Sequence, residues 1–265
     1  MLALARVFFL AGVLAPLSAP LADQAVVRLA SDEWCPYVCK SDREVQGGFL
    51  VTVATRSLSA TGLRVDARLL PLNRAMRETS DGTLDGVFAP PSHALLRPSV
   101  VLGYSRACFF TSTASTWTYR GIGSLKGSRL GLIGQYEYDI GEADQYIRDN
   151  ASNRYAVDFS YGATAGHTNA KKLLLGRFDL LLEHELVMTK LIAELKAERK
   201  FRNAGCLEQA FPLVIGFATA TKRSELLLTA LAQGVRKLEK SGELDRIRER
   251  YGLKNNQDNL RKLHK

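Results

Sequence analysis

Short apolar strands alternate with amphipathic helices along most of this 265-residue chain, and the pattern runs through twice. In the first run, strands are expected at residues 26–30, 63–70 and 84–89, with helices at 49–60 and 72–79. Segment 63–70 has the period of two of a half-buried strand, because Val65, Ala67 and Leu69 alternate with charged residues. Strands joined through helices by short connections form mainly parallel sheets, so the sequence predicts an α/β lobe.

The second run begins after a Ser/Thr-rich segment at 111–118 and predicts a second α/β lobe. Its strands are expected at 129–133, 155–160 and 178–182, and its helices at 143–148, 168–175 (N-capped by Thr168) and 185–197. The strand at 214–220 and the helices after it have no partner there, so we expect them to return to the first lobe. The predicted division is lobe 1 at 23–110 and 214–265, lobe 2 at 116–208, and hinge crossovers at 111–115 and 209–213.

Residues 1–22 have the features of a secretory signal peptide. Arg6 is followed by an apolar stretch at 7–17, which is shorter than the roughly 20 residues that a membrane-spanning helix needs. The cleavage position stays open, because cutting after Ala22 puts Pro20 where a small residue is preferred. The sequence therefore predicts a periplasmic protein that is soluble once the signal peptide is removed.

The formal net charge of +9 raises the question of nucleic-acid binding. Acidic residues are interleaved with the basic ones through 190–200 and 222–250, as on solvated helix faces. Export also separates the protein from the genome. We therefore expect a monomer that binds a small solute, with no nucleic-acid partner.

Four cysteines in an exported chain predict disulfide bonds. Three pairings are possible, and we favour Cys35–Cys39 with Cys108–Cys206, since the second pair would lie at the ends of neighbouring crossovers. The four histidines show no metal-ligand spacing with the cysteines, so we expect no metal and no cofactor.

Five segments, taken in order, resemble the bacterial extracellular solute-binding proteins of the polar amino-acid type, which serve ABC uptake systems. They are EWCPYVC…GGFLVTVA, LDGVFAPPSHALLRPSVVLGYSRACFF, SLKGSRLGLIGQYEY, LLLGRFDLLLE and PLVIGFATATKRSELLLTALAQGVRKLEKSGELDRIRERYG. The resemblance implies the type II periplasmic binding fold, in which two lobes, each a mainly parallel sheet flanked by helices, close on a solute about a two-crossover hinge. It also implies an inner-membrane ABC permease as partner.

In lobe 1, the resemblance implies an aromatic ligand wall at Trp34 and Tyr37 and a carboxylate-binding guanidinium at Arg97. Arg74 is a second candidate contact for an anion, because it opens a helix that follows a strand. Asp85 and Asp179 precede equivalent strands of the two lobes, and we expect both to be structural.

In lobe 2, the resemblance implies that the turn Gly134, Gln135 and Tyr136 presents backbone amides to the ligand. Gln135 and Tyr136 replace the usual Thr or Ser there. Glu183 ends a predicted apolar strand, near the place where the family has an aspartate that accepts the ligand's ammonium group; one residue later this chain has His184.

The expected function is capture of a small polar or anionic solute, amino-acid-like, for ABC-type uptake. A sensor or orphan binding protein remains an alternative, as does a periplasmic enzyme comparable to cyclohexadienyl dehydratase with Glu183 or His184 as general acid. The sequence shows no nucleophile elbow, no closely spaced carboxylate pair and no metal motif, so we expect a protein that is not an enzyme.

Overall fold

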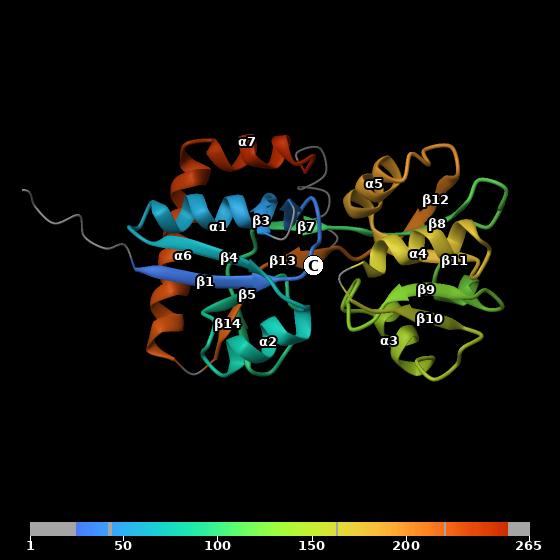
Figure 1. The fold of residues 1–265 in the computed structure, drawn as a ribbon, viewed down its shortest axis with the longest axis horizontal. Helices are drawn as coiled ribbons and strands as arrows, with labels where there is room; N and C mark the ends of the chain where they lie inside the picture. Colours follow the sequence, from blue (N-terminus) through green and yellow to red (C-terminus); the bar gives the residue numbers. More distant parts are fainter. Residues whose placement is uncertain (1–24, 42–43, 163, 220, 254–265) are drawn as a thin grey trace, which may run out of the picture.

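Two α/β lobes joined by a pair of crossovers make up the structure, a computed structural model that describes residues 25–41, 44–162, 164–219 and 221–253 (Figure 1). The predicted signal peptide at 1–22 and the end of lobe 1 from residue 254 lie outside the described residues. Within those ranges, no helix combines the length and the apolar character that crossing a bilayer requires.

The sheet of lobe 1 has the strand order β4-β1-β5-β14-β6. Its strands are β1 (Val26–Ser31), β4 (Arg64–Leu69), β5 (Gly86–Phe88), β6 (Leu96–Pro98) and β14 (Ile215–Ala218). β1 runs parallel to β4 and β5, whereas β14, which returns from lobe 2, lies antiparallel between β5 and β6. Helices α1 (Phe49–Ser59), α6 (Lys222–Lys240) and α7 (Glu243–Arg250) pack on one face and α2 (Leu72–Ser80) on the other.

The sheet of lobe 2 repeats this arrangement with the order β10-β9-β11-β8-β12. Its strands are β8 (Ala107–Ser112), β9 (Leu130–Ile133), β10 (Val157–Ser160), β11 (Leu180–His184) and β12 (Phe201–Cys206). β9 runs parallel to β10 and β11, and β8, which enters from lobe 1, lies antiparallel in fourth place. The turn η1 (Ile122–Leu125) and α3 (Glu142–Asp149) cover one face; α4 (Ala165–Leu174) and α5 (Glu185–Glu194) cover the other.

The hinge is a two-stranded ribbon in which β7 (Gly103–Ser105) pairs antiparallel with β13 (Phe211–Leu213). The first crossover therefore precedes the predicted one at 111–115, and strand β8 lies in the sheet of lobe 2, although residues 107–110 were expected in lobe 1 and residues 111–112 in the hinge. The Ser/Thr content of residues 111–118 made this region resemble a linker, but β8 opens with a fully buried apolar run and lies inside the second sheet, between β11 and β12. The second crossover contains β13, which lies within the expected range 209–213.

Most predicted helices and strands are confirmed to within a few residues, but the start of α4 is not. The helix begins at Ala165 after the N-cap position Thr164, and Thr168 lies inside it, with its N–H bonded to the Thr164 carbonyl. The sequence did not predict the first turn of α4, because that turn contains Gly166 and glycine is a poor helix former.

The structural roles predicted for Asp85 and Asp179 are confirmed. Asp85 accepts the backbone N–H of Arg28 at 2.7 Å and pairs with Arg223, while Asp179 accepts the N–H of Arg129 at 2.8 Å. Each carboxylate thus fixes the start of the neighbouring strand in its lobe.

Both favoured disulfides are present. Cys35–Cys39 closes the loop that follows β1, and the strands β2 (Cys39–Ser41) and β3 (Glu44–Gly47) form a hairpin directly after it. Cys108–Cys206 joins adjacent strands β8 and β12 inside lobe 2, so it stabilises that sheet instead of the hinge.

Candidate functional site

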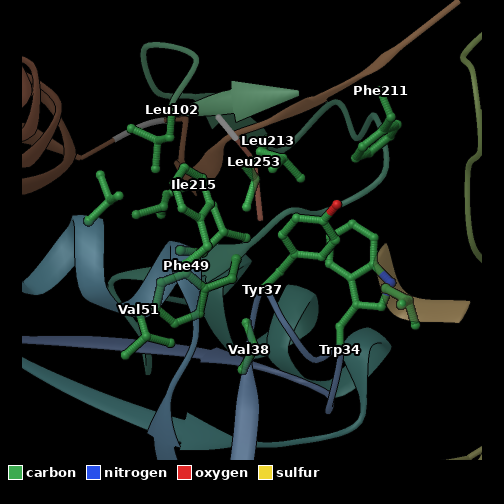
Figure 2. Packing of buried hydrophobic residues seen from close by; sticks show 14 of the residues in the cluster. Trp34, Tyr37, Val38, Phe49, Val51, Leu102, Phe211, Leu213, Ile215 and Leu253 are labelled. Atoms are coloured by element: carbon green, nitrogen blue, oxygen red, sulfur yellow. The ribbon is translucent and has the colours of Figure 1, made fainter. Parts of the chain in front are cut away.

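The loop closed by Cys35–Cys39 places two aromatic rings at the junction of the lobes. The rings of Trp34 and Tyr37 lie 4.3 Å apart between centroids and are both buried (Figure 2). The Tyr37 hydroxyl is 2.7 Å from Ser105 Oγ in the hinge, which in turn is 2.8 Å from His184 Nδ1 in lobe 2. This chain of hydrogen bonds connects the aromatic wall to the first crossover and to the second lobe.

Hydrogen bonds cross directly between the lobes at two places among the described residues. The Tyr136 hydroxyl of lobe 2 donates to Asp32 Oδ2 at the end of β1, at 2.8 Å. The backbone N–H of Ser92 in lobe 1 donates to Glu137 Oε2 in lobe 2, at 2.7 Å. The structure is therefore in a closed arrangement of the lobes.

Closure leaves two small cavities between the lobes, which share Asp32, Trp34 and Tyr136 as walls. The first has a volume of about 40 Å³ and also borders Glu183, Gly166 and Leu191; the second, of about 20 Å³, borders His184 and Phe211. Such volumes suit a few water molecules, whereas small-molecule sites usually occupy roughly 300–1,000 Å³. A bound solute must therefore displace Trp34 or Tyr136, or hold the lobes further apart.

Glu183 is the most deeply buried carboxylate of this cleft. It is completely shielded from solvent at the end of β11, and its Oε1 accepts the N–H of His184 at 2.8 Å. Burial raises the pKa of Glu183 to about 8. Its Oε2 has no hydrogen-bond partner among the described residues, and neither has the buried Nε1 of Trp34. An unpaired acceptor and an unpaired donor thus belong to side chains lining one cavity, where such atoms ordinarily find a partner in water or ligand.

Asp32 is the second carboxylate of the cleft, and it was not among the ligand residues predicted from the sequence. Burial raises the pKa of Asp32 to about 6, against the opposing effect of the hydrogen bond from Tyr136. The sequence signal was its place at the carboxyl end of the first parallel strand, where α/β sheets hold their ligands.

His184 is neutral in this site. Burial lowers its pKa to about 3, and its ring stacks on that of Tyr138 with centroids 5.9 Å apart. A neutral imidazole cannot serve as the counter-ion of Glu183.

Of the predicted ligand residues, the structure brings Trp34, Tyr136 and Glu183 to the first cavity, with Tyr37 packed directly behind Trp34. Gly134 lies under the ring of Tyr161, and Gln135 is exposed at a φ of 71°. Neither residue borders the two cavities.

The structure places both predicted anion contacts away from the cleft. Arg97 is exposed in the edge strand β6 and pairs with Glu225 of α6, and Arg74 pairs with Glu78 along α2 at 2.6 Å. Side chains alternate along a strand, so the apolar Leu96 is buried while Arg97 points the opposite way. The described residues that border the two cavities include no arginine.

Neither a protein-family model nor a curated protein matches this chain in sequence. Solved structures do match. A histidine kinase sensor domain with similarity to periplasmic binding proteins superposes with a TM-score of 0.72 at 15% identity, covering 86% of this chain and 97% of that chain. An ancestral arginine-binding protein bound to arginine gives 0.69 at 15% identity, over 86% and 98% of the two chains. The chain has the type II periplasmic binding fold.

A third protein with this periplasmic binding fold is an amino acid ABC transporter substrate-binding protein from Streptococcus pneumoniae, bound to L-arginine. It superposes with a TM-score of 0.66 at 15% identity, covering 86% of this chain and 94% of that chain. At such identities the likeness establishes the fold, and the ligand must be argued from the residues of the cleft.

In this binding fold, the buried carboxyl of Glu183 makes stability depend on pH. Its pKa is raised from 4.5 to about 8 on folding, so the native state holds a proton that the unfolded chain has lost, and stability falls as pH rises through this interval. The pKa of Asp32 is raised from 3.8 to about 6, so this group also lowers stability as pH rises through that interval. The pKa of His184 is lowered from 6.5 to about 3, so this group instead increases stability as pH rises from about 3 to 6.5. Above pH 6.5, Glu183 is the remaining contributor of these three.

We therefore expect the free energy of unfolding of the ligand-free protein to fall by about 1.4 kcal/mol per pH unit between pH 6.5 and 8, or about 2 kcal/mol in total. Urea titrations at several pH values measure it. Glu183→Gln is expected to remove most of this slope, and an equal slope in the variant would show that another group causes it.

Proposed function

We propose that the protein binds a small solute bearing an ammonium group in the cleft between its lobes. The observation that carries this proposal is the unpaired Oε2 of Glu183, buried beside the unpaired Nε1 of Trp34 in a cavity bounded by both lobes. A ligand ammonium group would give the carboxylate the partner that burial of its charge demands. A carbonyl or hydroxyl oxygen of the same ligand would accept from the indole.

The other charged groups around the first cavity support a cationic ligand. Glu194 already pairs with His167 and lies near Lys190, and Glu33 pairs with Lys40. Among the described residues, Asp32 and Glu183 have no ion-pair partner, so the uncompensated charge of the cleft is negative once they ionise. With Arg97 and Arg74 engaged elsewhere, the proposal replaces the anionic solute expected from the sequence with an amine.

We further propose that the solute is captured in the periplasm and delivered to an inner-membrane ABC permease. The substrate-binding protein from Streptococcus pneumoniae, which shares this fold, supports an uptake role. The disulfides fit an oxidising compartment. A sensing role is the second candidate, and the histidine kinase sensor domain with its TM-score of 0.72 supports it. Crosslinking in cells, with recovery of either a permease or a kinase, separates the two.

Native mass spectrometry of the gently purified, mature protein tests the ligand class. The expected result is a co-purifying amine that is released unchanged on denaturation and restores a thermal shift when added back. Stabilisation by organic acids and phosphates, without stabilisation by any amine, would overturn the proposal. Chemical conversion of the solute during incubation would instead favour the enzymatic alternative.

Substitutions in lobe 1 give a matched test of the site. Trp34→Ala is expected to weaken binding of the amine by at least about tenfold, because it removes a buried aromatic wall and an indole donor. Arg97→Ala and Arg74→Ala are expected to change affinity less than about twofold, since both guanidinium groups lie outside the cleft in exposed ion pairs. Isothermal titration calorimetry measures all three. A large loss on Arg97→Ala with none on Trp34→Ala would place the site elsewhere.

A further inference from the structure

A large apolar groove lies beside the two inter-lobe cavities. Its volume is about 610 Å³, within the range of small-molecule sites. We call it the proline groove, because Pro90, Pro91, Pro98 and Pro212 line it. Among the described residues, no Asp, Glu, Lys or Arg borders the proline groove. Its surface therefore suits hydrocarbon and is poorly suited to a charged group.

The proline groove adjoins the candidate site. Pro91 and Phe211 border both the groove and the second inter-lobe cavity, so these two side chains form the partition between them. The Phe211 ring lies 5.7 Å from that of His184, which lies 4.9 Å from that of Trp34 (centroid distances; Figure 2 labels Trp34 and Phe211). The Phe211 ring thus stands between the groove and the cavity that borders Asp32.

Ile140 is the contribution of lobe 2 to the proline groove. It is 45% exposed and has a φ of 58°, a backbone conformation that β-branched residues rarely adopt. Strain of this kind is retained where the surrounding structure imposes it, often beside a ligand. The other lining residues belong to lobe 1 and the hinge, so a molecule in the groove touches both lobes and favours their closed arrangement.

We propose that the proline groove is an apolar subsite of the same ligand site, and that it holds the hydrocarbon part of an amine whose ammonium group pairs with Asp32 and Glu183. This inference rests on the proposed function. The two cavities beside the carboxylates, at about 40 and 20 Å³, have room for a head group at most, whereas the space for a ligand body lies beyond Phe211. The ligand class is therefore an amphiphilic amine instead of a small zwitterion.

A chain-length series tests the subsite. We expect the dissociation constant to fall about fourfold for each methylene that enters the groove, so that hexylamine binds more than tenfold tighter than butylamine. The matched compound 6-aminohexanoate, which ends in a carboxylate, is expected to bind no tighter than butylamine, because no Lys or Arg among the described residues borders the groove to compensate that charge. Calorimetry at pH 8 with the mature protein gives all three affinities.

Two exposed apolar residues provide the variants. Ile140→Asn replaces a groove residue with one that tolerates a positive φ, so the protein is expected to fold. It is expected to weaken hexylamine binding about tenfold and to leave butylamine unchanged. Val101→Asn is the control, since Val101 is similarly exposed (38%) and does not border the groove; both affinities are expected to stay as in the wild type.

The outcomes separate this inference from the proposed function. If butylamine binds in a Glu183-dependent manner but hexylamine binds no tighter, the amine site stands and the subsite is wrong. If Ile140→Asn and Val101→Asn both keep the wild-type length dependence, the hydrocarbon lies elsewhere and the subsite is again wrong. Absence of binding by every amine overturns both proposals. A concentration-dependent dimer that Ile140→Asn abolishes would show that a second copy of the chain covers the groove.

Discussion

Glu183→Gln is expected to lower the affinity for a cationic amine about a hundredfold at pH 8 and to abolish the pH dependence of binding. Only the ionised carboxylate forms an ion pair with the ammonium group, and its pKa in the empty cleft is about 8. The wild-type affinity should therefore rise about tenfold per pH unit up to pH 8 and then level off. Alkylamines remain protonated over this range, since their pKa lies near that of lysine, about 10.4.

Calorimetry between pH 6.5 and 9 measures this dependence above the pKa of Asp32, which is about 6. At pH 7 in two buffers of different ionisation enthalpy, about one proton should be released for each amine bound. Glu194→Gln is the control, because Glu194 borders the same cavity but already pairs with His167 at 2.9 Å; less than about a threefold change is expected. An affinity that does not vary with pH in the wild type would remove Glu183 from the site.

Gly234→Ala is expected to destabilise the protein by about 2–3 kcal/mol. Gly234 marks the closest approach of α6 to α1, where an added Cβ would lie 2.0 Å from the Ser57 carbonyl oxygen. Backbone atoms of a packed helix cannot move aside locally, so the two helices must separate and the core between them loosens. This cost should outweigh the gain of about 1 kcal/mol that alanine brings to a helix interior.

Gly134→Ala is the matched control for this substitution. Its Cβ would also lie 2.0 Å from an atom, but that atom belongs to the ring of Tyr161, which is 66% exposed and free to swing into solvent. Urea unfolding should therefore show a loss below about 1 kcal/mol. Equal losses in the two variants would contradict the view that the mobility of the neighbouring atom decides the cost.

Much of the fold follows from the sequence because its periodicities are local. The period of two over 63–70 and the helical spacing after it mark elements whose short connections leave few topologies. The first crossover was misplaced because Ser and Thr in 111–118 suggested a linker, while burial of β8 between β11 and β12 is a property of the tertiary structure. The composition of a segment does not indicate whether its strand lies inside a sheet.

The residues that line the cleft were predicted less completely than the fold. Glu183 was recognisable, since it is a lone carboxylate at the end of an apolar run, and the structure places it at the cavity between the lobes. Arg97 lies outside the two cavities because its side-chain direction depends on which face of the edge strand β6 is buried, and a shift of one residue reverses that direction. Asp32 was not predicted because an acidic residue after a strand is also a common signal for the end of that strand. Its hydrogen bond with Tyr136 joins residues that lie 104 positions apart in the sequence.

The position of β14 inside the sheet of lobe 1 also determines when each lobe can complete its fold. Lobe 2 is one uninterrupted segment from β8 to β12, so all of its sheet is available before the last crossover is made. The sheet of lobe 1 has β14 inserted between β5 and β6, and this strand lies near the C-terminal end of the chain. During synthesis from the N-terminus onward, the sheet of lobe 1 therefore stays incomplete until β14 is made, whereas lobe 2 can fold earlier. Strands β5 and β6 thus precede all of lobe 2 in the chain but gain their shared neighbour β14 only after it, and their open edges need protection in the interval.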